Sequence, residues 1–138
     1  MHIPVIVTFY AGLNGLIALV LALLVVRLRV KTKTDLGTGG HLTLEQAIRA
    51  HGNFIEYVPI ILLLLLLLEL CGTRPIVLHA LGAALTVGRL LHAWGLHTTP
   101  GESAGRAAGI FLTWATLLIA AVLAIVRGVS GALIAPLS

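Results

Sequence analysis

Four long apolar stretches constrain the fold of this chain more than any other feature. They cover approximately residues 3–29, 43–71, 75–96 and 105–127. Each has roughly the 20 apolar residues that an α-helix needs to cross the hydrocarbon core of a bilayer. Only 10% of the residues are charged, whereas a soluble domain carries about 25%. The sequence therefore predicts an all-α integral membrane protein, with residues 1–138 forming a single bundle of four transmembrane helices.

Composition and spacing argue against several classes of function. The single cysteine, Cys71, cannot form a disulfide within the chain, and the six histidines show no metal-ligand spacing, so we assign no metal. No dense basic patch suggests nucleic-acid binding. Small multidrug transporters also have four short spans, but they depend on a carboxylate in the first span. The residues between Ile3 and Val26 include no carboxylate.

Basic residues indicate the orientation in the membrane. The connection after the first span holds Arg27, Arg29, Lys31 and Lys33, which we interpret as membrane anchors apart from Arg29. The opposite side has only Arg74 and Arg127. Because cytoplasmic loops carry the excess of Lys and Arg, we expect the first and third connections to be cytoplasmic and both termini to lie on the other side.

A polar stripe precedes the apolar run Ile60–Leu68. Arg49, Asn53 and Glu56 are spaced at i, i+4 and i+7, which places them within roughly 60° of arc on one face of a helix. One interpretation is membrane anchoring, with Glu56 paired to Arg49. However, an asparagine adds nothing to anchoring and is costly in a bilayer, so the stripe favours a binding site.

Polar residues from all four helices approach the cytoplasmic membrane face in this orientation. Arginine binds carboxylates through two parallel hydrogen bonds, a glutamate can take an ammonium group, and an asparagine can pair with a peptide amide. A small tripeptide with two carboxylates, one amine and a thiol fits these groups. A further arginine near the thiol would favour the nucleophilic thiolate. The residues that converge are Arg29, Arg49, Asn53, Glu56, Arg89, His92 and Arg106.

The segment Arg49-Ala-His-Gly-Asn-Phe-Ile-Glu-Tyr-Val-Pro59 resembles the signature of the MAPEG family, the membrane-associated proteins of eicosanoid and glutathione metabolism. The family pattern has Arg-Ala, Asn, Glu and Pro at matching positions at the start of the second of four helices. Length and span layout are also similar, so the resemblance covers nearly the whole chain. The motif is more similar to bacterial members of the family than to the eicosanoid synthases. This implies a multi-pass protein of the bacterial inner membrane with its site facing the cytoplasm.

The resemblance implies a homotrimer that binds glutathione between neighbouring subunits. It implies a glutathione-dependent transferase or peroxidase-like enzyme that acts on a lipophilic electrophile or hydroperoxide. Arg106 corresponds to the arginine that faces the glutathione sulfur, with Ser103 as an alternative. Arg29, or else Arg27, corresponds to the basic residue that ends the first helix. The remaining residues that correspond to glutathione contacts are Arg49, Asn53, Glu56, Tyr57, Arg89 and His92.

The sequence departs from the family pattern at two positions. Eicosanoid synthases carry a tyrosine four residues after the position of His92, where this chain has Leu96. Aligning Arg106 also requires a one-residue gap. These departures leave a second interpretation open, a non-catalytic lipid-binding or scaffold protein on the same fold. The tail 128–138 receives no predicted structure.

Overall fold

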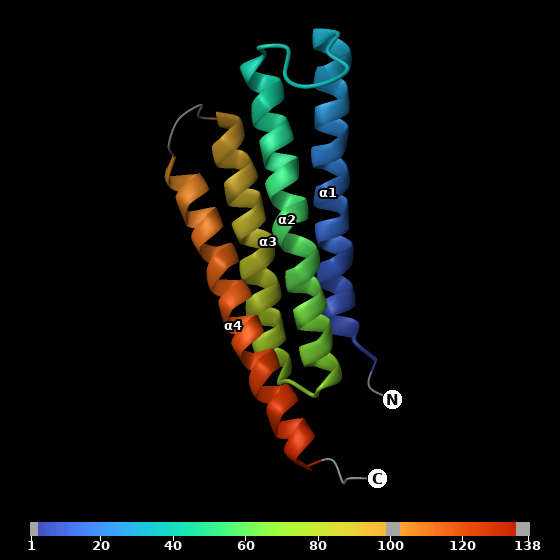
Figure 1. Ribbon diagram of the computed structural model, residues 1–138, viewed down its shortest axis with the longest axis vertical. Coiled ribbons are helices and arrows are strands. Elements are labelled where there is room, and N and C mark those ends of the chain that lie inside the picture. The colour runs from blue at the N-terminus through green and yellow to red at the C-terminus, as the bar shows by residue number, and fades with distance from the viewer. Residues whose placement is uncertain (1–2, 99–102, 135–138) are drawn as a thin grey trace.

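The computed structural model describes residues 3–98 and 103–134, with side chains up to residue 131. It contains four helices, α1 (Val5–Thr32), α2 (Leu42–Leu70), α3 (Pro75–Thr98) and α4 (Ala104–Ile134). All four are long and apolar enough to cross a membrane, which confirms the predicted four-helix membrane bundle. Helices α1 and α3 end, and α2 and α4 begin, at one end of the bundle, whereas α1 begins and α4 ends toward the other (Figure 1).

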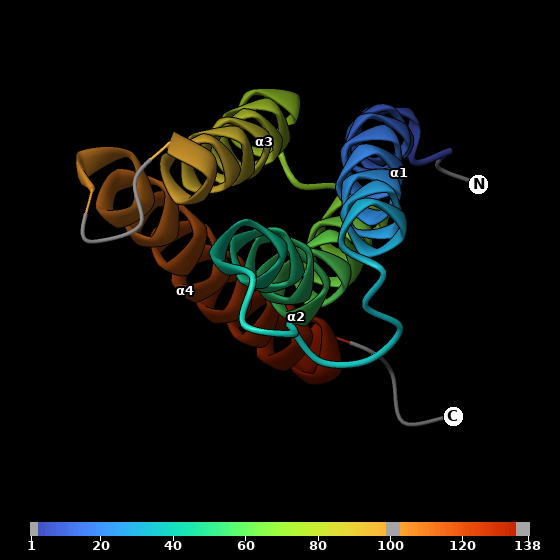
Figure 2. The same ribbon diagram turned by 90° about the horizontal axis from the view of Figure 1, so that it is seen from above.

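The helices α2 and α3 form the middle of the bundle. Helix α1 packs against both of them on one side and α4 packs against both on the other, whereas α1 and α4 have no contact within the described ranges (Figure 2). In α2 the core residues recur at spacings of three and four, so one face of the helix is buried throughout. The core includes Val7 and Leu21 of α1, Phe54, Val58, Ile61, Leu65 and Leu68 of α2, Leu78, Leu81 and Leu85 of α3, and Ala120 of α4.

Helices α2 and α4 both continue past residues that commonly end a helix. Helix α2 continues through Pro59, as predicted for a membrane helix whose neighbours compensate for a lost hydrogen bond. Helix α4 continues to Ile134, so the predicted end at residue 127 is too early. The glycines after Arg127 have low helix propensity, but an apolar segment in lipid must satisfy its backbone groups internally. The final residues, 135–138, lie outside the described part.

A buried amide joins α1 to α3. The Asn14 side chain, only 1% exposed, donates hydrogen bonds from Nδ2 to the Tyr10 carbonyl oxygen at 2.9 Å and to Thr86 Oγ1 at 3.0 Å. One turn away, the Tyr10 ring lies against Gly82, where any Cβ atom would collide with it. Hydrogen bonds and small residues, rather than apolar attraction, hold helices together in lipid. This contact holds α1 against α3.

Glu69 caps the first helix although it belongs to the second. Its carboxylate is buried and accepts hydrogen bonds from the backbone N–H groups of Ile6 at 2.9 Å and Val7 at 2.7 Å. The first N–H groups of a helix have no partner within the helix, and the residue before α1, Pro4, provides no side-chain cap. Glu69 thus satisfies donors that would otherwise be unpaired.

Glu69→Ala should destabilise the protein by about 2 kcal/mol, because two backbone donors at a helix N-terminus lose a charged acceptor. Glu69→Gln keeps one carbonyl acceptor and should lose less. Amide hydrogen exchange at Ile6 and Val7 in detergent micelles provides the measurement, and exchange should be fastest in Glu69→Ala. Unchanged exchange at both amides would contradict the capping role.

Candidate functional site

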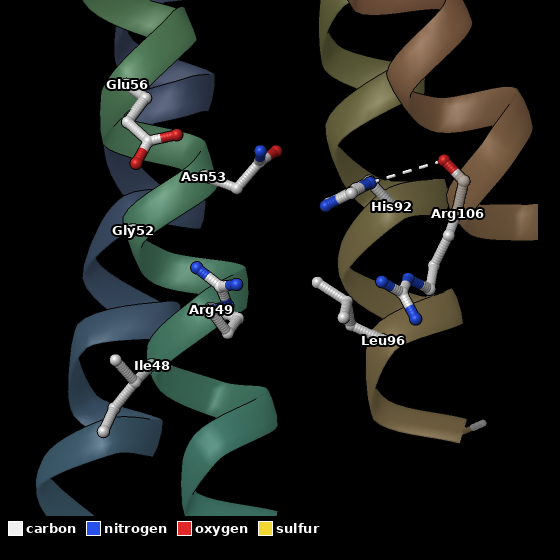
Figure 3. A pocket seen from close by; sticks show the side chains of 8 residues that line it. All are labelled: Ile48, Arg49, Gly52, Asn53, Glu56, His92, Leu96 and Arg106. Carbon is white, nitrogen blue, oxygen red and sulfur yellow. Dashed lines mark hydrogen bonds between the residues drawn. The ribbon is translucent and has the colours of Figure 1, made fainter. Parts of the chain in front are cut away.

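A cavity of about 450 Å³ opens between α2 and the paired helices α3 and α4 (Figure 3). It lies toward the end of the bundle where α2 and α4 begin and α3 ends. Its size falls within the roughly 300–1,000 Å³ of sites that hold drug-sized ligands. Three helices contribute to its wall. The lining residues are Ile48, Arg49, Gly52, Asn53, Glu56, His92, Leu96 and Arg106.

The polar stripe of α2 forms one wall of this cavity. Arg49, Asn53 and Glu56 all line it, as the helical spacing predicts. Arg49 and Glu56 are exposed, and among the described residues no hydrogen bond or ion pair joins them. The anchoring interpretation with a mutual Arg49–Glu56 pair is therefore not supported. One positive and one negative group on this wall are available to a ligand.

Glycines bring α3 and α4 together to form the opposite wall. A Cβ atom on Gly109 would lie 2.5 Å from the Gly88 carbonyl oxygen and 2.6 Å from the His92 backbone nitrogen. A Cβ atom on Gly95 would lie 2.6 Å from the Arg106 nitrogen. Backbones can approach this closely only where side chains are absent. The close packing puts His92 Nδ1 3.4 Å from the Arg106 carbonyl oxygen.

Arg89 lies behind the cavity rather than in its wall. Its side chain is 1% exposed, and Nη1 donates a hydrogen bond of 2.6 Å to Asn53 Oδ1. Its Nη2 donates to the Gly109 carbonyl oxygen at 3.4 Å, and its guanidinium lies 5.9 Å from the centre of the Tyr57 ring. Arg89 therefore joins three helices beneath the site. Within this chain it positions Asn53, whereas we predicted a direct ligand contact.

The contact with Arg89 determines which groups of Asn53 remain for a ligand. A guanidinium has only donors, so the oxygen of the Asn53 amide must face Arg89. The amide N–H groups of Asn53 are then the ones left to donate into the cavity. From the sequence alone we expected Asn53 to offer a donor and an acceptor equally.

A second cavity of about 450 Å³ adjoins the first and shares Asn53, His92 and Arg106 with it. Tyr57, Ser103, Ala107, Ile110 and Trp114 complete its lining. Trp114 and Ala107 are exposed on the outer surface of α4, where a membrane protein meets lipid. The two cavities thus place charged groups and apolar groups on either side of a shared His92–Arg106 wall.

Within one chain, Arg29 does not lie beside the other predicted site residues. Its Nη1 donates to the carbonyl oxygens of Thr34, Asp35 and Gly37 at 3.0–3.2 Å and so holds the α1–α2 connection. It lines a separate cavity with Val26, Val30, Lys33 and Asp35.

Two residues that line the first cavity, Gly52 and Ile48, were missed at the sequence level. Gly52 lies three residues after Arg49 on the same helical face, so its spacing could have identified it. Ile48 carries no comparable signal, because similar apolar residues occur throughout the chain. Leu96, which replaces an expected tyrosine, does line the first cavity, so the position faces the site even though its hydroxyl is absent.

The fold and the site together define a multi-pass membrane protein with a cavity lined by charged residues toward one end of a four-helix bundle. The sequence pattern of the MAPEG family matches residues 7–126, and the chain belongs to this family. It is also similar to the inner membrane protein YecN of Escherichia coli K12, with 38% identity over 110 residues. This match covers 80% of this chain and 82% of YecN, and YecN of E. coli O6:H1 gives the same values. The inner-membrane location that we predicted agrees with this relationship.

Proposed function

We propose that this protein is a glutathione-dependent membrane enzyme, a transferase or peroxidase-like protein that acts on a lipophilic electrophile or hydroperoxide. The observation that carries this proposal is the pair of adjoining cavities. One is lined by Arg49, Glu56 and Arg106, the other includes the apolar side chains of Ala107, Ile110 and Trp114, and the two share Arg106 and His92. A charged thiol and a lipophilic substrate would meet at this shared wall.

The charges of the first cavity fit glutathione. Two guanidinium groups and one carboxylate suit a ligand that has two carboxylates and one ammonium group. Arg49 would hold a carboxylate, Glu56 the ammonium group, and the N–H groups of Asn53 a peptide carbonyl. Arg89 would keep the Asn53 amide in this orientation through its hydrogen bond to Oδ1.

Arg106 would stabilise the thiolate. It lines both cavities, so a sulfur atom beside its guanidinium could face an electrophile in the second cavity. A nearby positive charge favours the thiolate over the thiol, and the thiolate is the nucleophile. Apolar substrates would arrive from the lipid, past Trp114 and Ile110.

We further propose that the protein acts as a homotrimer with glutathione between subunits, at the cytoplasmic face. Arg29 supports a shared site, because within one chain it lines a different cavity and could contribute to a ligand bound by a neighbouring copy. The basic connection between α1 and α2 supports a cytoplasmic position, and glutathione is abundant in that compartment.

Calorimetric titration of the detergent-purified protein with glutathione tests the proposal. We expect Arg49→Ala and Glu56→Ala each to weaken binding by roughly tenfold or more, because each removes a charged hydrogen-bonding partner. The double variant should show no measurable binding. Arg74→Ala is a matched control, since Arg74 is an exposed arginine outside both cavities, and it should bind like the wild type.

Absence of glutathione binding by the wild-type protein would refute the proposal. It would favour the non-catalytic alternative, a lipid-binding or scaffold protein on the same fold. Lipid that co-purifies with the wild type and is lost from a variant with a filled second cavity would then identify that alternative.

A further inference from the structure

The hydrogen bond to Arg106 determines the orientation of the His92 ring. Nδ1 lies 3.4 Å from the Arg106 carbonyl oxygen, and a carbonyl oxygen can only accept. Nδ1 therefore carries the hydrogen of this contact. In the neutral ring Nε2 is then an acceptor, and Figure 3 shows it on the side of the ring that faces α2 and Asn53. A proton acceptor thus faces the shared wall of the two cavities.

Other polar groups around the cavities are less suited to accept a proton. Arg49 and Arg106 are permanently charged donors. Glu56 and Tyr57 come from α2, and in the proposed function Glu56 binds the ammonium group. Ser103 Oγ donates to the Gly95 carbonyl oxygen and accepts from the Arg106 N–H, both at 3.3 Å. Arg89 lies beneath the site, and α1 contributes no titratable side chain to either cavity.

We propose that His92 Nε2 accepts the proton of the glutathione thiol, while Arg106 stabilises the thiolate that remains. This inference rests on the proposed function and adds a general base to it. His92 lines both cavities, so it can reach a thiol in the first and a substrate in the second. General bases of this kind typically contribute about 10²–10⁴-fold to a rate.

The proton cycle closes without a further partner when the thiolate adds to an activated double bond. The S–H bond breaks and its proton moves to Nε2, giving an imidazolium and a thiolate. The sulfur forms a bond to the β-carbon of an α,β-unsaturated carbonyl compound, and the π electrons of the double bond move toward the carbonyl group. The imidazolium then returns the proton to the α-carbon, which restores neutral His92. Lipophilic α,β-unsaturated carbonyl compounds are therefore the substrate class that this arrangement suits.

Two variants of the full-length, detergent-purified protein test the proposal, with glutathione and cinnamaldehyde as probes. His92→Asn keeps an N–H donor near the position of Nδ1 but has no base. His92→Ala leaves space for imidazole added to the buffer. We expect both to bind glutathione within about threefold of wild type and to react about 100-fold more slowly. Imidazole should restore part of the rate of His92→Ala, and the rise of the His92→Asn rate with pH should follow ionisation of the thiol alone, without the contribution of His92.

A matched control is His97→Asn, which changes an exposed histidine on the same helix outside both cavities and should react like the wild type. If wild type binds glutathione but His92→Asn keeps the wild-type rate and pH profile, the role of His92 is overturned and the proposed function stands. If wild type binds no glutathione, both are overturned. If His92→Ala fails to fold, the rate and pH profile of His92→Asn still decide whether His92 acts as the base.

Discussion

Replacing Gly109 with alanine should separate α3 from α4 and dismantle the ligand site. The new methyl group would lie 2.5 Å from the Gly88 carbonyl oxygen and 2.6 Å from the His92 nitrogen, and both are backbone atoms that cannot rotate away. Overpacking of this kind costs about 1–3 kcal/mol. The shift would also break the hydrogen bonds from Arg89 to the Gly109 carbonyl oxygen and from His92 to that of Arg106. We therefore expect a loss of stability together with a loss of glutathione binding.

Thermal unfolding in detergent measures the loss of stability. Calorimetric titration with glutathione, at a temperature where the variant is folded, measures the loss of binding. Gly15→Ala is the matched control, because a Cβ atom there meets nothing within 4 Å. It adds the same methyl group to a membrane helix and should leave stability unchanged or slightly raised, since alanine is the better helix former. If Gly109→Ala unfolds at the wild-type temperature and binds normally, the close contact of α3 and α4 does not support the site.

Arg106→Ala should reduce turnover by about 10²–10³-fold while glutathione still binds. Removal of one group that stabilises a developing or resident negative charge typically has an effect of this size. The substitution keeps the backbone groups of residue 106, so the hydrogen bonds to His92 and Ser103 remain possible. The loss should therefore come from the guanidinium itself.

Ultraviolet absorbance of the bound thiolate is the direct measurement for this variant. It should disappear in Arg106→Ala across the accessible pH range and persist in part in Arg106→Lys, which keeps a positive charge without the planar fork. Arg127→Ala changes an arginine near the opposite end of the same helix and should keep the signal. Thiolate absorbance that survives in Arg106→Ala, with glutathione bound, would rule out the assigned role. In contrast, His92→Asn should lower the rate of proton removal and alter its pH dependence.

The sequence was sufficient to predict features that depend on one helix at a time. Hydropathy and length identified four spans, because any segment that crosses lipid must be apolar and helical. Helical periodicity placed Arg49, Asn53 and Glu56 on one face, since side chains at i, i+4 and i+7 share a face in any regular helix. The common wall that these residues form was therefore predictable, and so was the family.

Only the tertiary structure decided which groups of different helices meet. Arg89 and His92 are three residues apart on α3, yet Arg89 is buried beneath Asn53 and His92 faces the cavities. Glu69 caps a helix more than sixty residues away along the chain, and Arg29 stays with its own loop. The physical reason is that spacing fixes directions within one helix but not the rotation, offset or separation between helices. Those are set by close contacts such as Gly88 against Gly109, where the absence of side chains allows two backbones to touch.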